Sequence, residues 1–144
     1  MNDARQTRAD YAYIQMMTTR WMDNDAYQHI NNAVYYSFFD SVANQYLMEA
    51  GVLDITKSPV IGFIVASSCN YRKPIAYPAK VEAAFRVNRI GTRSVEYGVA
   101  IFAEGDAEPA AFGTYTHAFV ERSSGKSVPI PGDVRAALER AKVG

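Results

Sequence analysis

Apolar and polar residues alternate with two different periods along this chain. Over residues 33–50 apolar side chains recur every three or four positions in two neighbouring rows, Val34, Phe38, Val42 and Tyr46 beside Tyr35, Phe39, Ala43 and Leu47. This spacing predicts a helix with a broad apolar face. Asn31 or Asn32 can cap its start, and Gly51 can end it. Because the apolar face is wide, we expect the helix to be largely buried.

The other segments are typical of strands. They cover residues 11–19, 60–71, 80–90, 93–102 and 110–120, and a short helix is expected after Pro131. Gly91 and Thr92 supply the turn between the third and fourth strands. Short connections favour antiparallel pairing among the last four strands. One long helix packed on such a sheet makes an α+β domain.

Length and composition narrow the possible classes of protein. A chain of 144 residues suits one domain, which we expect over residues 11–144 after a flexible polar lead over residues 1–10. Lys plus Arg and Asp plus Glu are each 15, so broad electrostatic binding to nucleic acid or to an anionic membrane is not expected. A single cysteine, Cys69, and the lack of an apolar targeting segment make the cytoplasm the expected location.

Candidate chemistry is concentrated just before the long helix. Five Asp and Asn residues fall within residues 20–32. Asp25 is placed to attack a carbonyl carbon or to deprotonate a water molecule, although a loop carboxylate or helix cap is the ordinary role of such a residue. The free N–H groups at the helix start, near Asn31 and Asn32, form a candidate oxyanion site. For Asp23 we expect a structural role, through hydrogen bonds to backbone amides.

The same segment resembles the signature of the 4-hydroxybenzoyl-CoA thioesterase-like family. The matching residues are the Asp-x-Asp pair Asp23 and Asp25, then His29-Ile30-Asn31-Asn32, then Tyr35. Further along, the similar positions are Tyr71 with Pro74, Gly91 with Ser94, Thr-His-Ala-Phe-Val at 116–120 and Pro129-Ile130-Pro131. The resemblance covers roughly residues 15–138 in the family's order, which makes it more specific than any one motif.

The resemblance implies a hotdog fold, an antiparallel sheet wrapped around a long central helix. It also implies an acyl-CoA thioesterase that forms a homodimer or a homotetramer, with active sites at the dimer interface. No metal and no organic cofactor is expected beyond the coenzyme A of the substrate. Asp25 would be the catalytic carboxylate, and a backbone N–H near the helix start would polarise the thioester carbonyl.

The resemblance further assigns roles around Asp25. His29, Asn31 and Asn32 would form the oxyanion site or shape it. Tyr35, Tyr71, Arg93 and Ser94 would contact the substrate, with Arg93 in the region that contacts the coenzyme A nucleotide. One position departs from the family pattern, because Gln28 replaces the usual glycine before His29. Its side chain would narrow the pocket or change the loop conformation.

Other interpretations of these residues remain. Asp23, Asp25 and His29 could suggest a metal site, but no further ligand cluster accompanies them. A Cys69–His117 nucleophile and base pair has no support from its spacing. The alternative functions are a hotdog hydratase or dehydratase and a non-catalytic acyl-CoA-binding protein. The sequence leaves open the acyl group, its carrier, the nucleophile or base role of Asp25 and the oligomer size.

Overall fold

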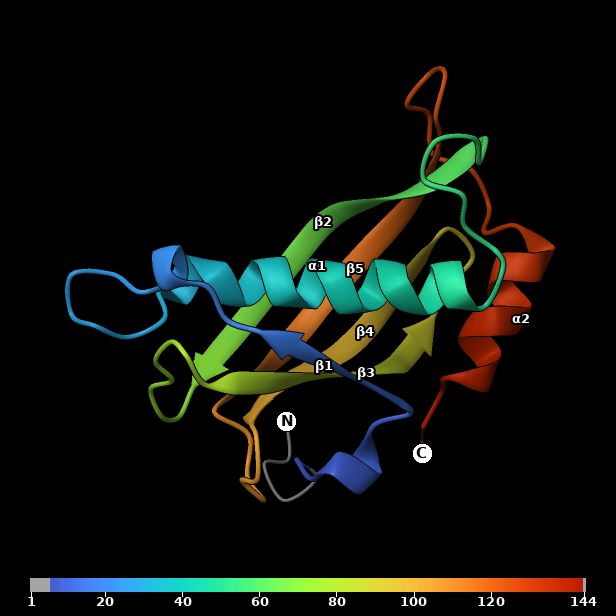
Figure 1. The fold of residues 1–144 in the computed structure, drawn as a ribbon. Helices are drawn as coiled ribbons and strands as arrows, with labels where there is room; N and C mark the ends of the chain where they lie inside the picture. The colour runs from blue at the N-terminus through green and yellow to red at the C-terminus, as the bar shows by residue number, and fades with distance from the viewer. Residues whose placement is uncertain (1–5, 144) are drawn as a thin grey trace.

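The computed structural model describes residues 6–143 and shows a five-stranded antiparallel sheet curled around one long helix (Figure 1). The elements, in chain order, are a 3-10 turn (Arg8–Asp10), β1 (Tyr13–Thr18), a second 3-10 turn (Trp21–Asp23), α1 (Asn32–Glu49), β2 (Val60–Tyr71), β3 (Lys80–Ile90), β4 (Ser94–Ala103), β5 (Ala111–Glu121) and α2 (Gly132–Arg140). The predicted α+β arrangement and its antiparallel pairing are confirmed.

Helix α1 begins and ends where the sequence predicted. The Asn31 side chain caps the start by accepting a hydrogen bond from the Ala33 amide at 2.9 Å. Gly51 follows the last turn with a φ of 79°, a backbone conformation that glycine adopts without steric cost. The buried helix positions are Tyr35, Phe38, Phe39, Val42, Ala43 and Leu47. A strip that includes Asp40 and Met48 stays exposed, so one face is buried and not most of the helix, because the sheet covers one side only.

The inner face of the sheet forms the main core with this helix face. Alternate residues of β3 and β4 point inward and are fully buried or nearly so, namely Val81, Ala83, Phe85, Val87, Val95, Tyr97, Val99 and Ile101. A smaller apolar cluster lies outside this core and contains Tyr11, Ala84, Ala100, Phe102 and Phe112. The polypeptide just before β1 therefore contributes to packing. Residues 1–5 of the expected flexible lead lie outside the described residues.

The strand order is β1-β3-β4-β5-β2, so β2 does not pair with β3, its neighbour in sequence. It pairs with β5 along its length, from Val60 opposite Glu121 to Tyr71 opposite Ala111. This order brings the start of α1 and the loop after β2 together at one end of the sheet, with α2 at the other end (Figure 1). Within residues 6–143, no helix is long and apolar enough to cross a membrane.

Candidate active site

Asp23 anchors the loop that leads into α1. Its side chain is 3% exposed. It accepts one hydrogen bond of 2.8 Å from the Arg20 backbone amide and another of 2.8 Å from the Arg20 guanidinium. Its backbone carbonyl accepts a hydrogen bond from the Asn31 amide at 2.9 Å. The structural role predicted for Asp23 is therefore confirmed, because its carboxylate holds Arg20 and its backbone carbonyl holds the Asn31 amide at the helix start.

Asp25 lies two residues further along, half-buried beside the same helix start. One carboxylate oxygen accepts a hydrogen bond from the Tyr27 amide at 2.9 Å, and the other accepts one from the Asn31 side-chain amide at 3.3 Å. Because Asn31 is also the helix cap, one side chain joins the Asp25 carboxylate to the first turn of α1. The carboxylate therefore lies near the positive end of the helix dipole.

The amides of the first turn of α1 differ in whether they find an acceptor among residues 6–143. The Asn31 amide bonds to Asp23, the Ala33 amide to the Asn31 side chain and the Val34 amide to the Asn31 carbonyl. The Asn32 N–H donates to no acceptor within residues 6–143. A free amide at a helix start can stabilise a developing negative charge.

Asn32 also lines a surface hollow, which we call the Asn32 hollow. It has a volume of about 300 Å³ and is lined by His29, Ile30, Asn32, Tyr35, Tyr71, Arg72, Lys73 and Pro74. The Tyr71 hydroxyl donates to the Asn32 carbonyl at 2.9 Å, and its ring meets the Tyr35 ring edge to face. Burial raises the pKa of Tyr35 to about 12, and burial followed by a hydrogen bond to Cys69 also raises the pKa of Tyr71. Both phenols therefore stay protonated at neutral pH.

The loop after β2 forms the other wall of this hollow and is tied to the loop before α1. The Ile30 amide donates to the Ile75 carbonyl at 2.7 Å, and the Tyr77 amide donates to the Asn24 side chain at 3.0 Å. Sequence reasoning did not single out Asn24 or Ile75. An Asn within a polar loop was the only local signal for Asn24, and no local signal identifies a backbone carbonyl such as that of Ile75.

The structure brings together the predicted residues Asp25, His29, Asn31, Asn32, Tyr35 and Tyr71. It does not bring Arg93 and Ser94 to them within one chain. Those two residues lie at the start of β4, whereas the hollow lies at the other end of the sheet. The ten residues of β4 span about 30 Å between these two ends. The Arg93 guanidinium donates there to the Ser127 carbonyl at 2.8 Å.

Within residues 6–143, the Cys69–His117 pair and the metal site considered as alternatives are not assembled. Strand register places Cys69 opposite Gly113 but His117 opposite Ile64, several residues away along β2. His117 instead shares a hydrogen bond of 2.9 Å with the Tyr97 hydroxyl. Among residues 6–143, no three His, Cys, Asp or Glu side chains are grouped in a way that could hold a metal ion.

Gln28 keeps a backbone conformation that favours glycine. Its φ is 67°, its amide donates to the Asp25 carbonyl, and its side chain is exposed and not among the residues that line the Asn32 hollow. Replacement of glycine therefore leaves the left-handed turn in place, and Gln28 adds backbone strain without narrowing this hollow.

This strain predicts the order of stability of two variants. Gln28→Gly should be at least as stable as the wild type, whereas Gln28→Val should unfold more easily than Gln28→Gly by about 1–2 kcal/mol. A β-branched residue is the least tolerant of a positive φ. Urea unfolding of the three proteins measures the difference, and equal stability of the two variants would contradict the assigned backbone conformation.

Comparison with known proteins places this geometry in a family. The model of the thioesterase-like superfamily matches residues 19–138. The PA5185 protein of Pseudomonas aeruginosa has a similar structure, with a TM-score of 0.93, 46% identity and coverage of 96% of this chain and 97% of that one. No curated protein sequence matches the chain.

Two more distant structures share the fold. DHNA-CoA thioesterase from Staphylococcus aureus is 23% identical, with a TM-score of 0.80 over 88% of each chain. A 1,4-dihydroxy-2-naphthoyl-CoA thioesterase from Synechocystis is 12% identical, with a TM-score of 0.79 over 88% of this chain and 94% of that one. The curled sheet around α1 is therefore a hotdog fold, and the chain belongs to the thioesterase-like superfamily.

Proposed function

We propose that this protein hydrolyses acyl-CoA thioesters at the site formed by Asp25 and Asn32. The observation that carries the proposal is the Asn32 amide, which has no acceptor among residues 6–143 and belongs to a residue lining a hollow beside a helix start that also holds a carboxylate. The names of several structural neighbours, among them a gentisyl-coenzyme A thioesterase, support a coenzyme A thioester as the substrate.

In this proposal the two groups divide the reaction between them. The Asn32 N–H donates to the thioester carbonyl oxygen and stabilises the oxyanion as the carbonyl carbon is attacked. Asp25 either attacks that carbon, forming a mixed anhydride that water then hydrolyses, or removes a proton from an attacking water. Both routes consume one water molecule and release a carboxylic acid and the free thiol of coenzyme A. His29, exposed at the rim of the hollow, shapes the entry.

Thiol release from a panel of short, long and aromatic acyl-CoAs tests this function. Release from at least one substrate without added metal is expected, and the best substrate indicates the acyl group. If no thioester releases thiol but the absorbance of an enoyl-CoA is lost, the protein is a hydratase. Binding of acyl-CoA with neither reaction would make it a non-catalytic binder.

We further propose that the working unit is a homodimer paired through β2. This edge strand is 12 residues long, and the exposed side chains of Phe63 and Val65 are 61% and 55% accessible. A long apolar edge is a template for pairing with another strand. Antiparallel pairing of two copies of β2 would place the Val60 end of one beside the Tyr71 end of the other.

Such pairing would complete the site. The Phe119 amide bonds to the Arg93 carbonyl, and β5 lies between β4 and β2, so Arg93 is two strands, about 10 Å, from the pairing edge. In the dimer Arg93 and Ser94 of one protomer would approach the Asn32 hollow of its partner. There they would contact the coenzyme A nucleotide, as the family resemblance implies.

A charge on this edge is expected to separate the protomers. Val65→Lys should give a monomer and lower acyl-CoA hydrolysis at least about tenfold, because the dimer would then carry two lysine charges on its paired apolar edges. Ile55→Lys places the same charge at an equally exposed position outside β2, and it should change neither the oligomeric state nor the hydrolysis of acyl-CoA. Light scattering after gel filtration measures the mass and also distinguishes a homodimer from a homotetramer. A Val65→Lys protein with wild-type mass and activity would rule out the β2 interface.

A further inference from the structure

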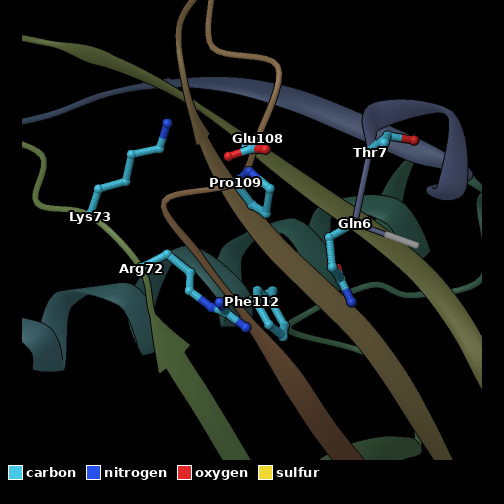
Figure 2. A pocket seen from close by; sticks show the side chains of 7 residues that line it. All are labelled: Gln6, Thr7, Arg72, Lys73, Glu108, Pro109 and Phe112. Atoms are coloured by element: carbon cyan, nitrogen blue, oxygen red, sulfur yellow. The ribbon is translucent and has the colours of Figure 1, made fainter. Parts of the chain in front are cut away.

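A second hollow shares the Arg72–Lys73 segment with the Asn32 hollow, and Figure 2 shows the side chains that line it. It has a volume of about 500 Å³ and is lined by Gln6, Thr7, Arg72, Lys73, Glu108, Pro109 and Phe112. We call it the Phe112 hollow. Arg72 and Lys73 line this hollow and the Asn32 hollow as well. The two residues therefore form a cationic rim shared by two adjacent depressions.

The backbone of this rim is hydrogen-bonded to Ala110, the residue that precedes β5. The amides of Arg72 and Lys73 both donate to the Ala110 carbonyl, at 2.7 and 3.2 Å. The Arg72 guanidinium lies over the Phe112 ring, 5.2 Å from its centroid, and Figure 2 shows it reaching toward that ring while Lys73 extends away from it. The backbone that carries the two positive charges is thus held in place, and the Arg72 side chain is packed on the Phe112 ring.

The present partner of Lys73 does not prevent ligand binding. The Lys73 ammonium is 3.3 Å from the Asp106 carboxylate, and the two side chains are 41% and 45% exposed. Exposed pairs of this kind contribute little to stability, so Lys73 can exchange this contact for a ligand anion. Glu108 lies at the same hollow and disfavours an anion close to its own carboxylate, which directs the ligand to the Arg72 side.

We infer that the Arg72–Lys73 rim binds an anionic group of the same substrate whose thioester occupies the Asn32 hollow. This inference rests on the proposed function, and it names a recognition site that Arg93 does not supply. Arginine and lysine side chains bind both phosphate and carboxylate oxygens, and the contact with the Phe112 ring orients the Arg72 guanidinium at the rim. The anion is therefore either a phosphate of coenzyme A or a carboxylate at the far end of the acyl group.

The test uses four thioesters and a double variant, Arg72→Gln with Lys73→Gln. Hexanoyl and glutaryl groups are each presented on coenzyme A and on N-acetylcysteamine, which lacks phosphate. If coenzyme A supplies the anion, KM of the double variant should rise at least about tenfold for both coenzyme A thioesters and stay unchanged for both N-acetylcysteamine thioesters. If the acyl group supplies it, KM should rise for the two glutaryl thioesters alone.

A control variant and a separate binding measurement make the result decisive. Arg140→Gln removes an exposed charge on the last turn of α2 that lines neither hollow, and it should leave every KM unchanged. Titration calorimetry with coenzyme A and with glutarate tests the rim even if the wild type hydrolyses nothing. If the wild type binds a probe and the double variant does not, anion binding by the rim would be supported even though the proposed hydrolysis had failed. Equal KM or equal affinity in wild type and double variant, or no binding of either probe by the wild type, would overturn the inference.

Discussion

Asp25→Asn is expected to lower kcat for acyl-CoA hydrolysis about a thousandfold and to change KM by less than about threefold. An amide can neither attack the thioester carbon nor accept a proton from water. The Asn32 N–H is untouched by the change, so the substrate carbonyl should still bind. The new side chain keeps the size of the old one, and its oxygen can still accept the hydrogen bond from the Tyr27 amide. Thiol release under saturating and limiting substrate separates kcat from KM.

Asp23→Asn is the matched control, because the same chemical change is made two residues away. Asp23 is buried and bonds to Arg20, so its loss should lower the free energy of unfolding by about 2 kcal/mol. Its kcat per folded molecule should stay within about tenfold of the wild type, because the residue acts only on the loop geometry. Full kcat in Asp25→Asn would remove Asp25 from the mechanism while leaving the reaction class intact.

Acidification is expected to destabilise the fold through His117. This side chain is 2% exposed, and its ring is so close to β2 that a Cβ on Gly62 would lie 2.7 Å from it. The groups that face it are the Tyr97 hydroxyl and the rings of Tyr115 and Phe119, while the carboxylate of Asp40 on α1 acts on it electrostatically. Burial lowers the pKa of His117 to about 4, and Asp40 opposes this shift only in part.

The direction of the pH effect follows from proton binding. In the unfolded chain His117 titrates near its ordinary pKa of 6.5, so between pH 6.5 and 4 the unfolded state binds a proton that the folded state excludes. The neutral His117 therefore makes its full contribution to the free energy of unfolding above pH 6.5, and this contribution is lost as the pH falls to 4. Its size is about 3 kcal/mol, from a difference of roughly 2.5 pH units.

Unfolding by urea at pH 7.5, 5.5 and 4.5 measures this effect. The protein has two histidines, so His29→Gln, which removes the exposed one, is the control and should keep the wild-type pH dependence. His117→Gln should be less stable at pH 7.5 but should lose less stability than the wild type between pH 7.5 and 4.5. Parallel pH profiles for wild type and His117→Gln would show that His117 does not carry the proton linkage.

The sequence by itself determined the local elements and much of the chemistry beside α1. The period of apolar residues and the capping of a helix both depend on residues that are close together in the chain. Helix α1, its Asn31 cap and the inward-facing rows of β3 and β4 were therefore predictable. The structural role of Asp23 was also predictable, because its partner Arg20 lies only three residues away. A contiguous motif likewise keeps Asp25, His29, Asn31 and Asn32 within one short loop.

The tertiary structure alone decided what depends on partners far apart in the chain. Pairing of β2 with β5 instead of β3 is a long-range choice that no local period encodes, and it creates the exposed edge of Phe63 and Val65. The same pairing carries Tyr71 to the Asn32 carbonyl and sets Arg93 at the far end of the sheet. Hydrophobic periodicity predicts which face of a strand is buried. The order of the strands in the sheet is fixed only when all the buried faces pack together around one helix.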